Sequence, residues 1–371
     1  MKVNTMGIEL RKKHIFRGRK NNFPSLFICF LMIAIAGLST NNADYRFYEY
    51  SYNNLSEAHL FSTMNEIGYT LFSYLFKSFG FGYQIFLFVF ICCSVVILYI
   101  GISRLTDKTF PVLLFYFIWP YPYRAIQLRF FISSVLLLLG ISYLKEYNLK
   151  NLFKYLLVII IATSMHSSSV IYLLMLLAYI RKRHVIITIA MLSSIFILIM
   201  SLLGSFSLFG NISAMFSFLG ENWRDSIKYL TFNRGNTYIF YYVAYFAIIL
   251  YVHLIKSAKN RQIYYNNASL LNLLYLSFIF IPLISLGDSF ERYFEVQLPL
   301  FYIIIVNDQH LYNQFAYNSY EIRIKKIEMV NFCFAFCIPI GVFYRKFLAT
   351  GRIESFQRVI MPLLKDNLLF K

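Results

Sequence analysis

The fold is decided by two neighbouring stretches, WPYPYRAIQLRFFISSVLLLLGISYL at residues 119–144 and LFKYLLVIIIATSMHSSS at residues 152–169. Each is apolar enough to lie in hydrocarbon. The first nevertheless carries two arginines near its start, and the second carries a histidine near its end. A charged side chain inside a bilayer is costly unless it faces a polar cavity. We therefore expect the polar groups of these two stretches to be functional.

The composition of the whole chain indicates a membrane protein. Of its 371 residues, 59% are hydrophobic and 14% are charged, whereas soluble domains carry about 25% charged residues. The apolar runs are long and do not alternate as barrel strands do, so helices that satisfy their own backbone are favoured. The sequence predicts an all-α, polytopic integral membrane protein, a single multi-pass domain over residues 1–371. We expect about eleven transmembrane helices, within roughly ten to twelve, and two longer outer loops.

The net charge of +18 does not indicate a nucleic-acid partner. The Lys and Arg residues lie in short clusters between apolar runs, where they orient a membrane protein. This rule places the basic residues 1–22 in the cytoplasm and the loops 38–80 and 205–236 on the outer side. The tail 345–371 also falls outside although it is basic, so either it is outside or the span count is wrong by one. The acidic surface facing these residues is a phospholipid bilayer or a lipid-linked phosphate.

Several segments are open to more than one interpretation. Residues 23–37 follow the basic start and fit an uncleaved first helix or a secretory signal peptide. Residues 65–79 have helical spacing with polar interruptions, as in a helix that lies in the interface. Two prolines after residues 109–119 block helix continuation. Residues 153–180 form either two short segments that meet at His166, or one kinked helix that would invert the later topology.

The arginines and the histidine are the candidate functional residues. A guanidinium group matches phosphate oxygens with two parallel donors. Arg124 and Arg292 could instead extend to lipid headgroups, whereas Arg129 lies one turn deeper. His166 either bonds between helices or acts as a general base. Arg124 and Gln127 share a helix face that excludes Arg129, so all three line one cavity only if the helix starts after Arg124.

Four short runs resemble one protein family. They are residues 44–48 (DYRFY), 66–69 (EIGY), 127–133 (QLRFFIS) and 166–169 (HSSS). Over most of residues 40–180 the chain resembles the EpsG family of Wzy-like polysaccharide polymerases. The resemblance implies a glycosyltransferase of the bacterial inner membrane that joins undecaprenyl-diphosphate-linked oligosaccharide repeat units at the periplasmic face. The product would be an O-antigen of lipopolysaccharide, a capsule or an exopolysaccharide, and a chain-length regulator is a further expected partner.

The implied reaction assigns roles to the candidate residues. Arg129 would stabilise the departing diphosphate, and His166 or Asp44 would take the proton from the acceptor hydroxyl. The other residues expected to bind the substrate or its diphosphate are Arg124, Gln127, Arg46, Arg292 and Glu291. We expect no cofactor, because the reaction needs no nucleotide sugar. The five cysteines lie in apolar runs without a metal-binding pattern, so we predict no metal site.

Two other classes of membrane protein compete with this hypothesis. A flippase for the same lipid-linked unit would tend to have two related halves, and the sequence has no convincing internal repeat. A membrane O-acyltransferase would draw its acyl donor from the cytoplasm, whereas His166 is expected near the outer face.

Overall fold

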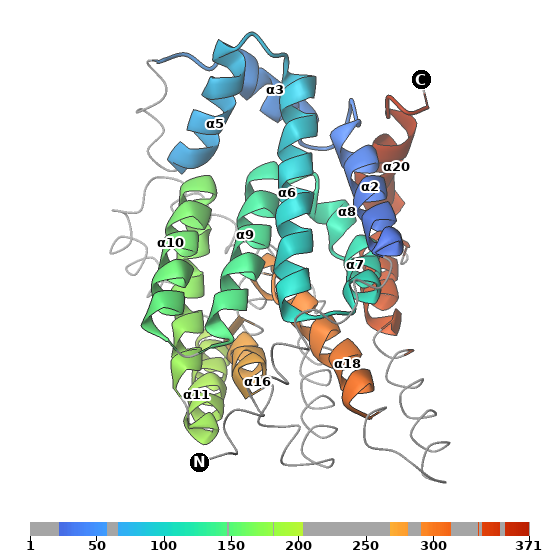
Figure 1. The fold of residues 1–371 in the computed structure, drawn as a ribbon. Coiled ribbons are helices and arrows are strands. Elements are labelled where there is room, and N and C mark those ends of the chain that lie inside the picture. The colour runs from blue at the N-terminus through green and yellow to red at the C-terminus, as the bar shows by residue number, and fades with distance from the viewer. Residues whose placement is uncertain are drawn as a thin grey trace, which may run out of the picture.

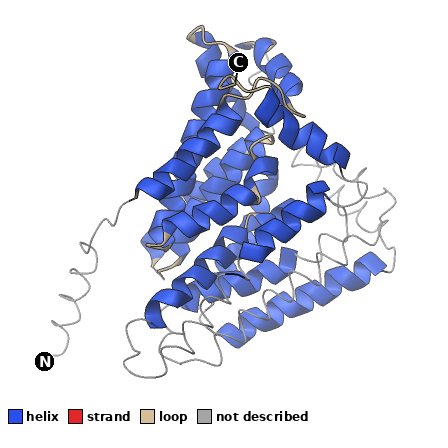
Figure 2. Cartoon of the chain, turned by 90° about the vertical axis from the view of Figure 1, so that its right-hand side faces the viewer, coloured by secondary structure: helices blue, strands red, loops and turns tan. Residues whose placement is uncertain are grey.

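The computed structural model describes residues 22–57, 66–146, 148–180, 182–202, 268–280, 291–312, 333, 336–348 and 353–370. Within these ranges every element is a helix, apart from one isolated bridge between Ser39 and Asn367 (Figure 2). The all-α prediction is therefore confirmed. Residues 1–21 of the predicted cytoplasmic start and the whole predicted loop 205–236 lie outside the described residues.

The helices fall into an N-terminal and a C-terminal group. The N-terminal group comprises α2 (Phe23–Gly37), α3 (Tyr45–Asn53), α5 (Ile67–Ser78), α6 (Tyr83–Leu105), α7 (Thr109–Ile118), α8 (Tyr121–Arg124), α9 (Leu128–Leu144), α10 (Leu149–Met165), the 3-10 helix η2 (Ser167–Tyr179) and α11 (Arg183–Leu202). The C-terminal group comprises α16 (Ala268–Leu276), the 3-10 turn η5 (Ser277–Phe280), α17 (Glu291–Glu295), α18 (Leu298–Tyr312), the π-helical turn η8 (Tyr344–Leu348) and α20 (Ile353–Lys365).

Helix α9 lies between α6 and α10 and packs against both (Figure 1). Its side chains Phe131, Val135 and Leu138 are buried. The turn to α10 is short because Asn148 caps that helix, its side chain accepting a 2.7 Å hydrogen bond from the backbone N–H of Asn151. Helices α9 and α10 are thus antiparallel neighbours, so the start of α9 and the end of α10 lie at the same end of the bundle. We call this the site end.

The described helices differ in whether they could cross a bilayer alone. Helix α6, with 23 residues, is long and apolar enough to do so, and it is the one such helix among the described residues. Six shorter apolar helical segments accompany it. The 17 residues of α9 extend about 26 Å at 1.5 Å per residue, close to the roughly 30 Å hydrocarbon thickness. The count of about eleven spans stays a prediction.

Several predicted boundaries agree with the structure. Residues 23–37 form α2, and α5 occupies most of the predicted interfacial segment. Helix α7 ends before the two prolines, and a separate four-residue helix follows. His166 has an extended backbone with φ −155° and ψ 112°, and it separates α10 from η2. The two-segment interpretation of this region is therefore confirmed, and the single kinked helix is wrong.

The C-terminal tail contains a helix that the sequence-based prediction did not include. Helix α20 packs against α2. Beyond α20, the buried amide of Asn367 donates to the backbone oxygens of Ala34 and Ile35, each at 3.0 Å. Thr40 donates to the backbone oxygen of Asp366 at 2.7 Å. The tail thus ends beside the α2–α3 connection, at the end of the bundle where α3 and α5 lie (Figure 1).

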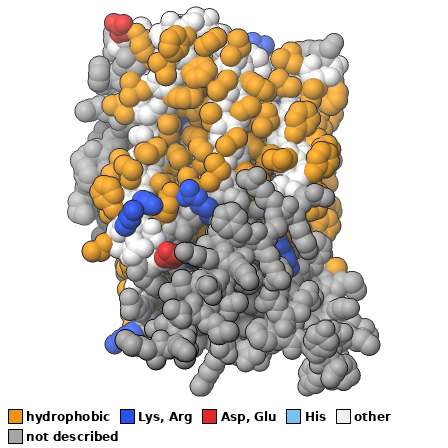
Figure 3. Space-filling model, in the orientation of Figure 1, with side chains coloured by type: hydrophobic (Ala, Val, Ile, Leu, Met, Phe, Trp, Pro, Cys, Tyr) orange, Lys and Arg blue, Asp and Glu red, His pale blue; other side chains and the backbone are white. Residues whose placement is uncertain are grey.

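The outer surface of the bundle is strongly apolar. Large hydrophobic side chains of α2 and α6 are exposed, among them Phe27, Ile85 and Val96. Figure 3 shows hydrophobic side chains over most of the described part of one face, with Lys and Arg gathered toward its lower part. Large continuous apolar patches mark contact with a membrane or another protein rather than with water.

Candidate active site

The site begins where α8 ends and α9 starts. Gln127 is the residue before α9, and Arg124 closes the separate helix α8. The helix therefore starts after Arg124, which is the condition under which Arg124, Gln127 and Arg129 can face one region. Arg129, in the first turn of α9, has about a third of its side chain exposed, at 32%. Arg124 is buried, at 2% exposed.

A single carboxylate joins Arg129 to His166. Glu66 lies immediately before α5, and its carboxylate is almost fully buried. One of its oxygens, Oε2, forms an ion pair with Arg129 Nη1. The other oxygen, Oε1, lies 2.6 Å from His166 Nδ1. The start of α5, the first turn of α9 and the end of α10 thus meet in one charged cluster at the site end.

Aromatic rings surround the Arg129 guanidinium. Its Cζ lies 5.5 Å from the ring centre of Tyr48, 5.8 Å from that of Tyr69 and 6.0 Å from that of Phe47. Cations are attracted to ring faces at these distances. Tyr48 and Phe47 lie on α3 and Tyr69 lies on α5, so both of these helices contribute rings around the guanidinium that α9 supplies.

Three candidate residues contact the ring of Phe130. Arg124 Cζ lies 4.8 Å and Arg292 Cζ lies 5.7 Å from its centre. The His166 ring meets it edge to face at 5.5 Å. Arg292, on the short helix α17, is thereby brought beside residues that precede it by more than 120 positions. Phe130 is thus the common neighbour of two arginines and of the candidate base.

Asp44 lies at the same end of the molecule, directly before α3. Burial raises the pKa of its carboxyl group, and the charges of Arg129 and Arg292 oppose this rise. Asp44 therefore lies within the electrostatic reach of both arginines. Of the three residues predicted to be catalytic, Arg129 and His166 are joined through Glu66, and Asp44 lies near enough to Arg129 to feel its charge.

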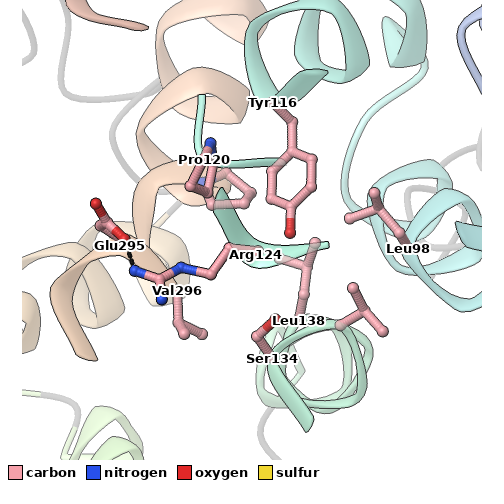
Figure 4. A pocket seen from close by; sticks show the side chains of 10 residues that line it. Leu98, Tyr116, Pro120, Arg124, Ser134, Leu138, Glu295 and Val296 are labelled. Atoms are coloured by element: carbon pink, nitrogen blue, oxygen red, sulfur yellow. Dashed lines mark ion pairs between the residues drawn. The ribbon is translucent and has the colours of Figure 1, made fainter. Parts of the chain in front are cut away.

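Arg124 makes a different set of contacts. It forms a buried ion pair with Glu295 of α17, and it donates to Gln127 Oε1 at 2.8 Å. Figure 4 shows Arg124 and Glu295 joined at a small pocket, with Tyr116 and Ser134 beside them and apolar side chains on the other walls. The alternative in which Arg124 extends to lipid headgroups is wrong, because the side chain lies inside the protein.

The remaining predicted residues are placed less centrally. Glu291 is buried on α17, one residue before Arg292. Arg46 is largely exposed on α3 and pairs with Glu49 at 3.4 Å, so it does not join the cluster. Among the described residues, no group of three or more His, Cys, Asp or Glu side chains could hold a metal ion.

The sequence-based interpretation missed two carboxylates, Glu66 and Glu295. Glu66 stands in the EIGY run that contributed to the family resemblance, and this was the signal to consider it. Its contacts depend on α5 folding back onto α10, which periodicity does not reveal. Glu295 has no comparable signal, because its partner precedes it by 171 residues.

The chain matches a known protein family. The model of the EpsG family matches residues 22–358 of this chain. No curated protein and no solved structure matches it. The matched range contains every residue of the site described above, from Asp44 to Glu295.

Proposed function

Because the chain belongs to the EpsG family, we propose that it is a glycosyltransferase that polymerises lipid-linked oligosaccharide repeat units. The substrate of this proposal is an undecaprenyl-diphosphate-linked oligosaccharide, and the product is a surface polysaccharide. The enzyme works in the bacterial inner membrane as a multi-pass protein, with the site end at the periplasmic face. The observation that carries the proposal is the cluster in which an arginine and a histidine share one buried carboxylate.

The proposed reaction exchanges one bond at a sugar carbon for another. The hydroxyl oxygen of the incoming unit attacks C1 of the growing chain, and the bond from C1 to the diphosphate oxygen breaks. The electron pair leaves with the lipid diphosphate, and the hydroxyl proton passes to a base, His166 or Asp44. Such proton transfers contribute about 100- to 10,000-fold in rate.

The cationic residues suit the leaving group. An Arg side chain has five N–H donors, and Glu66 occupies one nitrogen of Arg129 while about a third of the side chain stays exposed. The proposal assigns the donors that Glu66 does not engage to the phosphate oxygens. Arg292 contacts the ring of Phe130, the residue next to Arg129, and so adds a second positive charge near the Arg129 guanidinium. Stabilising charge as it develops on a leaving group is worth a few kcal/mol per group.

The apolar exterior fits a substrate that stays in the bilayer. The lipid tail of an undecaprenyl carrier needs no pocket in water, because it remains in hydrocarbon beside the exposed side chains of α2 and α6. The diphosphate then reaches the protein at the membrane surface. Exposed aromatic residues of α3, such as Phe47 and Tyr50, offer flat faces for sugar rings.

The test is the surface polysaccharide of a strain from which the gene is deleted. A polymerase predicts that single repeat units replace the long-chain polymer on a gel. Accumulation of lipid-linked units on the inner leaflet would indicate a flippase instead. Full-length polymer that lacks acyl groups would indicate an acyltransferase.

The variant Arg129→Ala tests the residue-level proposal in the same strain. We expect loss of the long-chain polymer with unchanged amounts of protein in the membrane. Arg358→Ala is the matched control, since that arginine is exposed on α20 and pairs with Glu354 at 3.6 Å. Normal polymer in the Arg129→Ala strain would remove Arg129 from the mechanism.

A further inference from the structure

Glu66 is the one member of the cluster to which the reaction above assigns no role. Its carboxylate is only 9% exposed. Each of its two oxygens has a different partner, one on α9 and one at the end of α10. A buried carboxylate is costly unless it is paired and hydrogen-bonded. The structure meets this requirement with two side chains that the reaction itself uses.

The contact with Glu66 determines which nitrogen of His166 can take a proton. An ionised carboxylate only accepts hydrogen bonds, so His166 Nδ1, at 2.6 Å from Oε1, carries the hydrogen of that contact. In the neutral imidazole the other ring nitrogen then bears the lone pair. Nε2 is therefore the atom of His166 that can accept a proton from a substrate hydroxyl.

We propose that Glu66 is a positioning residue that holds His166 with Nε2 as the proton acceptor, while Arg129 fixes the carboxylate from its other side. This inference rests on the proposed polymerase function and selects His166 over Asp44 as the base. The acceptor hydroxyl gives its proton to Nε2 as its oxygen bonds to C1. Glu66 stabilises the resulting imidazolium through Nδ1, as a buried carboxylate does in a Ser-His-Asp triad.

The backbone around Glu66 brings the carboxylate close to His166. Gly68, in the first turn of α5, lies directly against Ser164 of α10. A Cβ atom on Gly68 would be 3.1 Å from the carbonyl carbon of Ser164 and closer still to its hydroxyl. Helix α5 can therefore approach the end of α10 only because this position has no side chain. The close approach places Glu66, two residues earlier, beside His166.

The first experiment uses purified protein and lipid-linked repeat units extracted from the deletion strain. We expect Glu66→Gln to lower kcat at least about 10-fold, while the KM for the lipid-linked unit stays within about 2-fold because the proposal gives Glu66 no contact with the substrate. Glu354→Gln is the matched control, since it removes an exposed carboxylate that also pairs with an arginine. A wild-type kcat in Glu66→Gln, or a loss that appears only in KM, would overturn the proposal.

A double-mutant cycle separates positioning from general damage to the fold. If Glu66 acts through His166, then Glu66→Gln should change the rate less than about 2-fold in a His166→Ala background. The glutamine oxygen can still accept from Arg129, so that contact is retained. Fully additive losses would show that Glu66 does not act through His166 and would contradict the proposal.

Gly68→Ala tests the geometry without altering a charged group. The added methyl must push α5 away from Ser164, so we expect a loss of rate with little change in thermal stability. Gly82→Ala is the control, because nothing lies within 4 Å of its added carbon. Wild-type activity in Gly68→Ala would contradict the proposed approach of α5 to α10. If the wild-type protein itself joins no units, the proposed function fails and not merely the role of Glu66.

Discussion

At the level of single residues, the two arginines that flank Gln127 differ in their surroundings. The Arg129 side chain is about a third exposed, whereas Arg124 is enclosed with Glu295. A buried ion pair gains little net stability, but removal of one partner leaves an uncompensated charge inside the protein. We infer that Arg124 holds α8 against α17, and so places Arg292 beside Phe130.

The pair between Arg124 and Glu295 gives a stability prediction. Glu295→Ala should destabilise the protein by about 3–5 kcal/mol, seen as a lower melting temperature in detergent. The double variant Arg124→Met/Glu295→Leu should be more stable than Glu295→Ala, because it removes both charges together. Equal melting temperatures for Glu295→Ala and the wild type would show that the pair does not hold α17.

Asp44 gives a prediction of pH dependence. Burial raises the pKa of its carboxyl group, so Asp44 takes up a proton at a higher pH than an ordinary aspartate does. If its charge supports activity, for instance by orienting Arg129, activity should begin to fall at this higher pH as the solution is made more acidic. Asp44→Asn should remove this part of the profile, which rate measurements between about pH 4 and 8 would detect. A profile with the same acid limb in both proteins would exclude a role for its ionisation.

At the level of elements, the sequence predicted helices better than their partners. Residues 23–37 are bounded by a proline-containing start and by small residues, and α2 has these bounds. The polar run after Thr163 correctly indicated a break at His166. By contrast, the prediction did not include α20. Its apolar residues occupy one face of the helix among charged neighbours, and this pattern is also typical of a surface segment. Only the contact with α2 shows that this face is packed.

For the candidate site, too, the sequence predicted individual residues better than their partners. Arg129 and His166 stood out because charged groups in apolar sequence are costly. Their meeting could be expected from the antiparallel arrangement of two consecutive helices. Glu66 and Glu295 could not be assigned in this way, because each reaches its partners through contacts between elements distant in sequence. Local pattern carries no information on which distant helix supplies the counter-charge.

The contact between the tail and α2 gives a prediction at the element level. Asn367 is fully buried, and its amide hydrogens reach the free carbonyl groups near the end of α2. Asn367→Ala should lower the melting temperature, since two backbone acceptors would lose their donor. Phe370→Ala is the control, because that side chain is 71% exposed. An unchanged melting temperature in Asn367→Ala would show that α20 is held by its apolar face alone.

At the level of the whole molecule, the tail and the loop after α2 must lie on the same side of a membrane. The bridge between Ser39 and Asn367 leaves no room for a bilayer between them. This geometry does not say which side that is, and the proposal places it at the periplasm. It shows that the basic tail shares a compartment with residues 38–44.

Cysteine labelling tests this arrangement in whole cells. In a cysteine-free background, Tyr50→Cys and Phe370→Cys place single thiols at exposed positions of α3 and the tail. We expect an impermeant maleimide to label both from the outside. Labelling of one thiol alone would contradict the contact between the tail and α2, while protection of both until the cells are opened would place the site end in the cytoplasm.

The hydrogen bond from Asn367 to Ala34 joins residues 333 positions apart. At about 5–20 residues per second, a ribosome needs roughly 20 to 70 seconds to make the chain between them. For that interval the carbonyl groups at the end of α2 lack the donor that Asn367 later supplies. The hydrogen bonds from Asn367 to α2 therefore form late in biogenesis. A chain that stops before residue 367 would leave the carbonyl groups of Ala34 and Ile35 without this donor.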